Sequence, residues 1–223
     1  TLFLLVDVSF FAANAAKLGK SAGAWFPLLV GAAVFTLLVT WKRGRAAMSA
    51  EIRSGLLPMD LFLNEIPVQN PPRVSGTAVF MTANPEGTPP ALLHHFKHNK
   101  VLHQQVLLLN IRTEEVPEVP MKERVTVDKM EHGFWFVTAR YGFMQTPSIR
   151  EILKAASRKG LKTVESDTSF YLGRETLLTT GKSGMAGWRK FLFVFMSRNA
   201  RPATAYFGLP PNRVVELGTQ IEL

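Results

Sequence analysis

Hydrophobic positions divide this chain into two blocks of different character. Residues 1–41 are almost continuously apolar, whereas residues 42–223 alternate short apolar runs with polar and charged positions. In the first block, the apolar runs 2–16 and 24–41 are separated by the sequence KLGKSAG. A helix needs about 20 mostly apolar residues to span the hydrocarbon core of a bilayer, and each run comes close to that length. The pattern therefore predicts two membrane-spanning helices joined by a short turn.

The residues that flank the second apolar run support this interpretation and orient it. Trp25 and Trp41 stand at its two ends, where interfacial aromatic residues are enriched. The basic sequence KRGR follows Trp41 directly, and an excess of Lys and Arg marks the cytoplasmic side of a membrane. We therefore expect the residues after about 42 to be cytoplasmic. A helical hairpin buried in a soluble protein is the alternative, but buried helices of this length usually carry a polar edge.

Two polar residues interrupt the first apolar run. Asp7 and Asn14 are seven positions apart, so they share one face of a helix. A carboxylate inside a membrane is costly to bury and is a functional-site hypothesis. Alternatively, Asp7 pairs with a neighbouring helix or lies near the membrane surface. The sequence leaves these options open, and Asp7 and Asn14 are candidates for an ion pathway or for helix packing.

The stretch after the apolar block is too apolar to be a free linker. Residues 46–54 continue the second helix, and residues 56–66 hold seven large apolar side chains. Such a stretch either lies along the membrane surface or docks on the following domain, and we favour docking. Pro71 and Pro72 then mark a boundary. The expected organisation is the last membrane helices in 1–45, a linker or juxtamembrane helix in 46–72, and a cytoplasmic domain in 73–223.

The chain from residue 73 onward alternates strand-like and helix-like segments. His132 and Gly133 lie where a hairpin turn is expected, and Thr146 or Ser148 is a suitable cap before a helix. Alternating strands and helices predict an α/β domain around a mixed sheet. The expected strands are 74–82, 105–113, 124–131, 134–143 and one or two within 162–180, and the expected helices are 89–102, 146–160 and 187–200.

Four histidines occur within ten positions, at His94, His95, His98 and His103. His94 and His98 have the i,i+4 spacing that can hold zinc on a helix. No HExxH motif, no cysteine and no nearby carboxylate completes a ligand set in the sequence. We therefore expect solvated or helix-capping histidines and no metal site.

Two further searches for chemistry end without a site. The sequence LTTGKSG (178–184) contains the GKS of a phosphate-binding loop, but the glycine required five positions before Gly181 is replaced by Thr176. We interpret this stretch as a flexible loop before the last helix. No GxSxG motif or other catalytic constellation occurs, so we expect no enzyme and no catalytic residue.

The formal net charge of +9 requires an anionic partner to be considered. Nucleic-acid binding needs basic residues clustered with stacking aromatics, whereas the basic residues here are spread along the chain with one local concentration. On a chain tethered to the inner leaflet, attraction to anionic lipid is the simpler interpretation. We therefore expect a lipid bilayer, and no nucleic acid, as a partner. The local concentration consists of Lys182, Arg189, Lys190, Arg198 and Arg201.

Several long segments resemble the bacterial KUP/HAK/KT potassium uptake family. They include FLLVDVSFFAANAAKL, WFPLLVGAAVFTLLVTWKRGR, PPALLHHFKHNKVLH, FYLGRET and MSRNARPATAYFGLPPNRVVELGTQIEL. The resemblance covers essentially the whole chain in order. It implies that the histidine-rich stretch is a family signature in the cytoplasmic domain and has no catalytic role.

The resemblance implies a fold and an activity beyond what the residue pattern gives. Members of this family are twelve-helix K⁺/H⁺ symporters whose core resembles the inverted repeats of amino acid–polyamine–organocation transporters. By that resemblance, residues 1–41 are the last two transmembrane helices of a multi-pass inner-membrane protein, followed by its cytoplasmic C-terminal domain. The K⁺ site is then expected outside this fragment, in an N-terminal transmembrane core that is its main partner. No cofactor is implied, because K⁺ and H⁺ are the transported ions.

Three roles for the cytoplasmic domain stay open at this point. It regulates or assembles the transporter, it senses a nucleotide or another small ligand that gates transport, or it forms a homodimer. These roles are compatible with one another.

Overall fold

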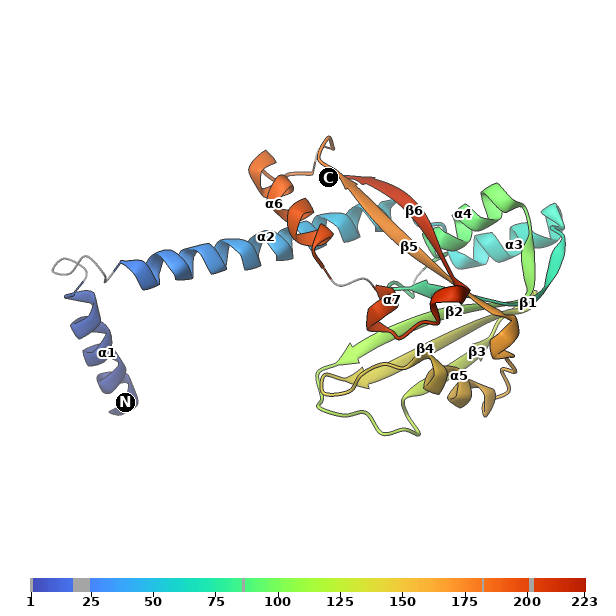
Figure 1. Ribbon diagram of the computed structural model, residues 1–223, viewed down its shortest axis with the longest axis horizontal. Helices are drawn as coiled ribbons and strands as arrows, with labels where there is room; N and C mark the ends of the chain where they lie inside the picture. The colour runs from blue at the N-terminus through green and yellow to red at the C-terminus, as the bar shows by residue number, and fades with distance from the viewer. Residues whose placement is uncertain (1, 18–24, 86, 182, 201–202) are drawn as a thin grey trace.

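Two apolar helices precede a six-stranded α/β domain in the computed structural model (Figure 1). Helix α1 comprises Leu2–Ala15, and helix α2 comprises Phe26–Ser54. The domain that follows joins α2 without an independent linker. The structure describes residues 2–17, 25–85, 87–181, 183–200 and 203–223.

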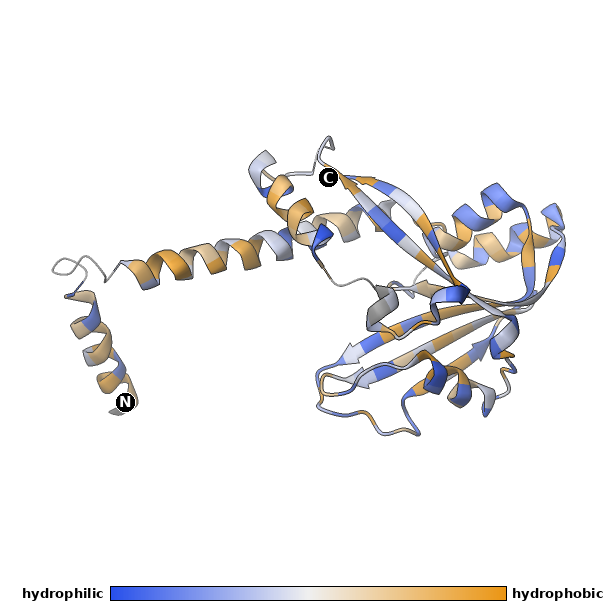
Figure 2. Ribbon diagram, in the orientation of Figure 1, coloured by the Kyte–Doolittle hydropathy of each residue, from blue (hydrophilic) through white to orange (hydrophobic). Residues whose placement is uncertain are grey.

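Helix α2 is a single helix of 29 residues that changes character along its length (Figure 2). Pro27 occupies its first turn, where the missing N–H costs little. Among the described helices, only α2 is long and apolar enough to cross a membrane, since α1 has 14 residues. The apolar side chains of both helices are exposed, so the described residues do not bury these helices as a hairpin buried in a soluble protein would require. The predicted continuation through 46–54 is confirmed.

The sheet has the strand order β3-β4-β2-β1-β5-β6. All neighbours are parallel except β3 and β4, which form the predicted hairpin with positive φ angles at His132 and Gly133. The predicted mixed sheet is therefore confirmed. The strands are β1 (Arg73–Thr82), β2 (Leu102–Glu114), β3 (Val125–Lys129), β4 (Phe134–Gly142), β5 (Thr168–Leu178) and β6 (Val214–Glu222).

Helices cover both faces of this sheet, because its buried strands present apolar side chains on each side. Helices α3 (Met59–Gln69) and α4 (Pro90–Asn99) pack on one face, and α5 (Ile149–Ser157) packs on the other. Phe62 and Ile66 of α3 are buried in the core with α4 and the strands, so the stretch after α2 docks on the domain as we favoured.

Strands β5 and β6 extend beyond the rest of the sheet as a two-stranded arm. Strand β5 pairs with β1 only as far as Tyr171, whereas it pairs with β6 to its end at Leu178. Figure 1 shows this arm diverging from β2 and β4 and reaching α2 and α6 (Gly187–Arg198). The arm is the part of the domain that meets the long helix.

Some predicted boundaries change. The helix predicted over 89–102 ends at Asn99, because Lys100 adopts a left-handed conformation and Leu102 already pairs with Arg73 as the first residue of β2. The segment 162–180 forms one strand, β5, preceded by a 3-10 turn at Glu165–Asp167. A second such turn, Pro211–Arg213, and the short helix α7 (Ala203–Tyr206) lie between α6 and β6.

Candidate functional site at the junction of the long helix and the sheet

One face of α2 is buried against the sheet domain just after its apolar segment ends. Thr40, Gly44 and Met48 are the buried residues of this helix, and they recur every four positions. That spacing places them in one row along the helix surface. The remainder of the apolar segment stays exposed, so the contact is confined to this row.

Helix α6 crosses α2 at this row with very close packing. A Cβ atom at Gly44 would overlap the ring of Phe193, which is fully buried. Trp41 packs on the same ring, with centroids 5.6 Å apart. Only glycine lets the two helices approach this closely, so Gly44 sets the crossing point.

The arm reaches the same place from the sheet. The tips of β5 and β6 contribute Leu177, Ile221 and Leu223 to an apolar cluster with residues of both helices. The junction is therefore a small core of its own, assembled from four elements that are distant in the sequence. Its buried members are Met48, Leu177, Phe193, Val194, Ile221 and Leu223.

Lys190 fastens α6 to the arm. Its side chain is only 7% exposed, and its Nζ donates hydrogen bonds to the main-chain oxygens of Gly181 and Leu223, the latter at 2.7 Å. Charge-assisted hydrogen bonds of this kind are about twice as strong as neutral ones. The stretch after β5 that we interpreted as a flexible loop is therefore held at Gly181 by α6.

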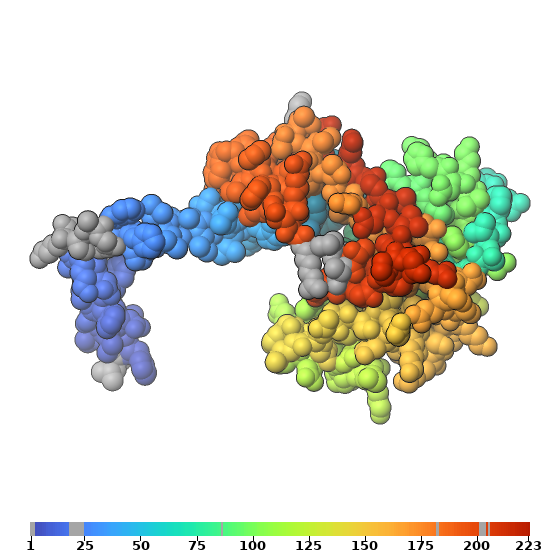
Figure 3. Space-filling model, in the orientation of Figure 1, coloured from blue at the N-terminus to red at the C-terminus, as the bar shows by residue number. Residues whose placement is uncertain are grey.

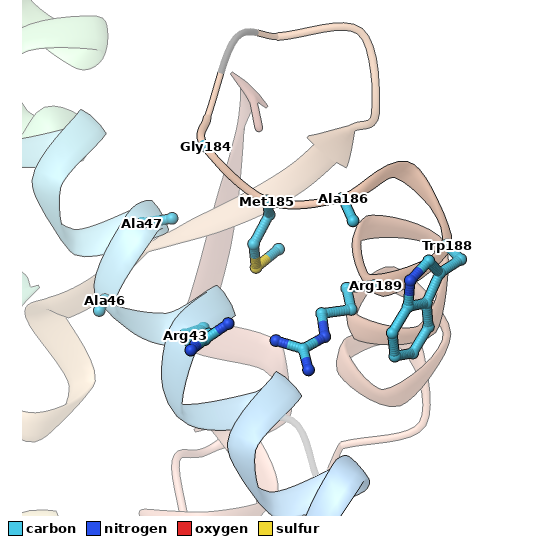
Figure 4. Close-up of a pocket in the computed structure, with 8 residues that line it drawn as sticks. All are labelled: Arg43, Ala46, Ala47, Gly184, Met185, Ala186, Trp188 and Arg189. Carbon is cyan, nitrogen blue, oxygen red and sulfur yellow. The ribbon is translucent and has the colours of Figure 1, made fainter.

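A shallow groove of about 640 Å³ lies between α2 and the start of α6 (Figure 4). Arg43 and Arg189 line it together with Trp188 and Met185. Figure 4 shows the guanidinium of Arg189 extending from α6 toward the side where Arg43 lies. Neither arginine forms an ion pair within the described residues. The groove is thus cationic, with an aromatic wall.

Asp7 and Asn14 lie on α1, outside this junction. Both are exposed. The Asn14 Nδ2 donates to the oxygen of Phe10 at 3.0 Å, and Lys17 Nζ lies 3.4 Å from Asn14 Oδ1 as a hydrogen-bond donor. The structure brings no further candidate residue to them among the described side chains.

The histidines differ in environment more than the sequence suggests. His94 and His98 stack on the surface of α4 with centroids 5.9 Å apart, whereas His95 is only 3% exposed. His95 contacts Phe80 and Tyr171, so the expectation that all these histidines are solvated or capping is wrong for it. Within the described ranges, no group of three or more histidine or acidic side chains could hold a metal ion.

Burial lowers the pKa of both His95 and His103. When His103 is protonated, its charge lowers the pKa of His95 further, while the carboxylate of Asp167 opposes the shift at His103. Both rings are therefore neutral in the folded domain at neutral pH. They act as packing residues between α4 and the sheet.

Sequence reasoning missed the junction itself. It treated the KRGR sequence after the apolar run only as a basic flank, and did not single out Gly44 within it. It counted Lys190 among the basic residues that attract lipid, although the side chain of Lys190 is buried and bonds to the arm. The available signal was the position of Lys190 directly before the apolar sequence FLFVF, on a helix expected to be amphipathic.

Comparisons with known proteins account for both parts of the chain. Residues 1–46 match the model of the K⁺ potassium transporter integral membrane domain, and residues 75–223 match that of the K⁺ potassium transporter C-terminal domain. No solved structure matches the chain.

The similar proteins are all described as probable potassium transport system proteins. The chain is 57% identical over its whole length to a probable potassium transport system protein Kup of Myxococcus xanthus. It is 52% identical to the corresponding protein of Azoarcus sp. and 51% identical to a Kup 2 protein of Syntrophobacter fumaroxidans. The chain spans 34% of the length of each of these relatives. These names describe transport proteins and no enzyme, and the chain belongs to the K⁺ potassium transporter family.

Proposed function

We propose that this chain is the C-terminal third of a potassium uptake transporter. The observation that carries this proposal is the order of the two matched family domains along a chain that spans 34% of Kup relatives. The protein would import K⁺ through an N-terminal transmembrane core that precedes residue 1. This core is its main partner, and no cofactor is required because K⁺ is the transported ion.

We further propose K⁺/H⁺ symport on a core of inverted repeats, as the family resemblance implies. In transporters of that architecture, substrate sits near the midplane of the bilayer between repeats. The K⁺ site would then lie outside residues 1–223. Asp7 and Asn14 remain candidates for the ion pathway or for packing of α1 against that core, and their exposure on α1 is compatible with either role.

The proposed location is the inner membrane, with α1 and α2 as the last two spans. Basic residues directly after Trp41 support a cytoplasmic position for everything after about residue 42. The corresponding domains are 1–45 in the membrane, 46–72 as juxtamembrane helix and docked linker, and 73–223 in the cytoplasm. The start of β1 at Arg73 agrees with the last of these boundaries.

We propose that the cytoplasmic domain regulates transport through the junction. Helix α2 is continuous from its apolar segment to Ser54, so a shift of the membrane part would move the row Thr40–Gly44–Met48 as one body. That row packs against α6 and the arm, which continue into the sheet. Movement in either part would therefore reach the other through a small packed core.

The test is K⁺ uptake in a bacterial strain that lacks its own K⁺ transporters. Three proteins are compared at matched membrane levels: the full-length protein, a version that ends at residue 45, and the full-length Gly44→Leu variant. The full-length protein should restore uptake, and the other two should insert but transport poorly. Absence of uptake by the full-length protein would refute the transport function. Normal uptake by the truncated protein would leave transport standing and refute coupling through the junction.

A second role, small-ligand sensing, is favoured by the strand order. From β1, the chain first adds β2 and β4 on one side of the sheet and then returns to add β5 and β6 on the other side. Ligands of doubly wound sheets bind outside the carboxyl ends of the strands at such a switch point. A nucleotide or other small anion that binds there would raise the melting temperature of the chain. A homodimer is the remaining candidate assembly, and sedimentation of the detergent-solubilised chain at increasing concentration would reveal it.

A further inference from the structure

Helix α6 presents an aromatic face that nothing in the described chain covers. Trp188, Phe191 and Phe195 are 56%, 72% and 59% exposed. They are three and four positions apart, so they form one stripe along the helix. The opposite face carries the buried Phe193 and Val194, which pack on the junction. Contiguous exposed aromatic side chains of this kind mark an interaction site.

The position of α6 along α2 indicates what this stripe meets. Phe193 packs on Trp41 and Gly44, which lie at the end of the apolar segment of α2. At a rise of about 1.5 Å per residue, these contacts fall within one helical turn of that end. Figures 1 and 3 show α6 lying across α2 at this level, between the exposed apolar part of α2 and the sheet domain. If α2 spans the bilayer, α6 lies at the cytoplasmic headgroup layer.

The charges beside the stripe select the chemistry of the partner. Arg43 and Arg189 face the groove between the two helices without an acidic partner in the described structure. The Arg189 guanidinium also lies 5.1 Å from the ring centroid of Trp188, which joins cation and aromatic wall. Guanidinium groups bind phosphate oxygens with paired hydrogen bonds. Tryptophan and phenylalanine beside basic residues are typical of helices that lie in the membrane interface.

We propose that α6 is an interfacial helix that binds anionic phospholipid of the inner leaflet. Trp188, Phe191 and Phe195 insert at the boundary of headgroups and acyl chains, while Arg43 and Arg189 bind the lipid phosphate in the groove. The proposal rests on the membrane-spanning role of α2 in the proposed function. Because Lys190 ties α6 to Gly181 and Leu223, the lipid contact also fixes the tip of the arm. The composition of the leaflet would thus act on the sheet domain directly.

The absence of cysteine in the chain allows a direct depth measurement. Single-cysteine variants Phe191→Cys, Phe35→Cys and Val68→Cys are labelled with an environment-sensitive fluorophore in the otherwise complete chain. Phe35 is exposed on the apolar segment of α2, and Val68 is exposed on α3 at the end of the molecule away from α1. Each variant is reconstituted in phosphatidylcholine vesicles with or without phosphatidylglycerol. Quenching is measured with brominated acyl chains and with aqueous iodide.

The label at position 191 should be quenched by brominated lipid and protected from iodide, and more so with phosphatidylglycerol present. Replacing both arginines by glutamine should remove that dependence, with the association constant of α6 for the anionic surface falling about fivefold for each arginine lost. The label at Val68 should respond to iodide only. Adding inorganic phosphate to the chain in detergent should not change the label at 191, because the proposed ligand is a lipid.

Two results would overturn the proposal, and a third would instead refute its premise. A label at 191 that iodide quenches in vesicles would mean that α6 stands free in water. Protection of this label from both quenchers in vesicles would mean that the stripe docks on protein. If the label at Phe35 also escapes lipid quenching, α2 does not span the membrane, and the proposed function itself is wrong.

Discussion

The sheet and the junction are two hydrophobic cores of unequal size in one molecule. Among the described residues, the two faces of the sheet bury 15 and 12 apolar residues, whereas the junction buries 6. The sheet core is built from strands that pair along most of their length. The junction instead adds to its small apolar cluster the close approach at Gly44, the contact between the rings of Trp41 and Phe193, and the hydrogen bonds of Lys190.

This difference separates folding from coupling. Apolar burial contributes about 25 cal/mol per Å², so the larger sheet core dominates the stability of the domain. The smaller junction can open at a lower free energy while the sheet stays folded, as local openings do in most proteins. The proposed coupling through the junction requires a part of this kind, which opens more easily than the sheet. Single substitutions should therefore unfold the sheet or release the junction, but not both.

The largest effect is expected from the sheet core. Phe134 is fully buried between α3 and the strands, with its ring 6.0 Å from that of Phe62. Phe134→Ala should lower the free energy of unfolding of the domain by about 3–5 kcal/mol, because it leaves a cavity. Hydrogen exchange of β2 and β4 amides in the detergent-solubilised chain measures this loss. Phe143→Ala, at a position 61% exposed, is the control and should change it by less than about 0.5 kcal/mol.

A smaller and more local effect is expected at the helix crossing. Gly44→Leu forces a side chain into the ring of Phe193, and overpacking of this kind costs about 1–3 kcal/mol. Exchange should accelerate in α6 and at the tips of β5 and β6, while β2 and β4 keep their protection. Gly31→Leu on the same helix is the matched control, since a Cβ there would have no described atom within 4 Å apart from its chain neighbours and the backbone of its own helix. Equal effects of the two substitutions would contradict the crossing at Gly44.

The hydrogen bonds of Lys190 are expected to stabilise the junction by somewhat less than the helix crossing does. Lys190→Met keeps the length of the side chain but removes both hydrogen bonds to Gly181 and Leu223. Hydrogen bonds to charged groups are worth about 1.5–3 kcal/mol, and methionine recovers part of this by apolar packing. The tip of the arm should exchange faster, with α2 unchanged. Arg198→Met, which alters an exposed residue of α6, should leave the arm as it was; loss of protection there too would mean that charge alone matters.

The contrast between the two regions also explains what the sequence could predict. Strand β2 was evident because LLL lies within a run flanked by polar residues, and the hairpin because His132 and Gly133 suit its turn. Both are local patterns. The family and the absence of an enzyme site also followed from contiguous motifs in the sequence.

The junction was not predictable because its residues are far apart in the sequence and meet only in the folded structure. Gly44, Lys190 and Leu223 come from three segments whose meeting depends on the reach of the arm beyond Tyr171. Burial of His95 escaped prediction for a similar reason. Four neighbouring histidines suggested a solvated face, but the ring of His95 packs against Phe80 and Tyr171 of the sheet.

The smallest expected effect concerns pH and should fall on the sheet rather than the junction. Burial lowers the pKa of His95 and of His103, so the folded domain binds protons at these rings less tightly than the unfolded chain does. Stability is then undiminished above the unfolded histidine pKa of about 6.5 and decreases as the pH falls below it. Thermal unfolding of the chain between pH 7.5 and 5.5 measures this decrease. His95→Gln should reduce this dependence of stability on pH. The part that His103 contributes should be small, because the carboxylate of Asp167 opposes the lowering of its pKa.

The control is His98→Gln, which removes an exposed ring from the same helix and should keep the slope of the parent chain. A slope that His95→Gln leaves intact would assign the pH dependence to groups outside this cluster. Acceleration of exchange in α6 at low pH, with β1 and β2 unaffected, would place the sensitive region at the junction instead.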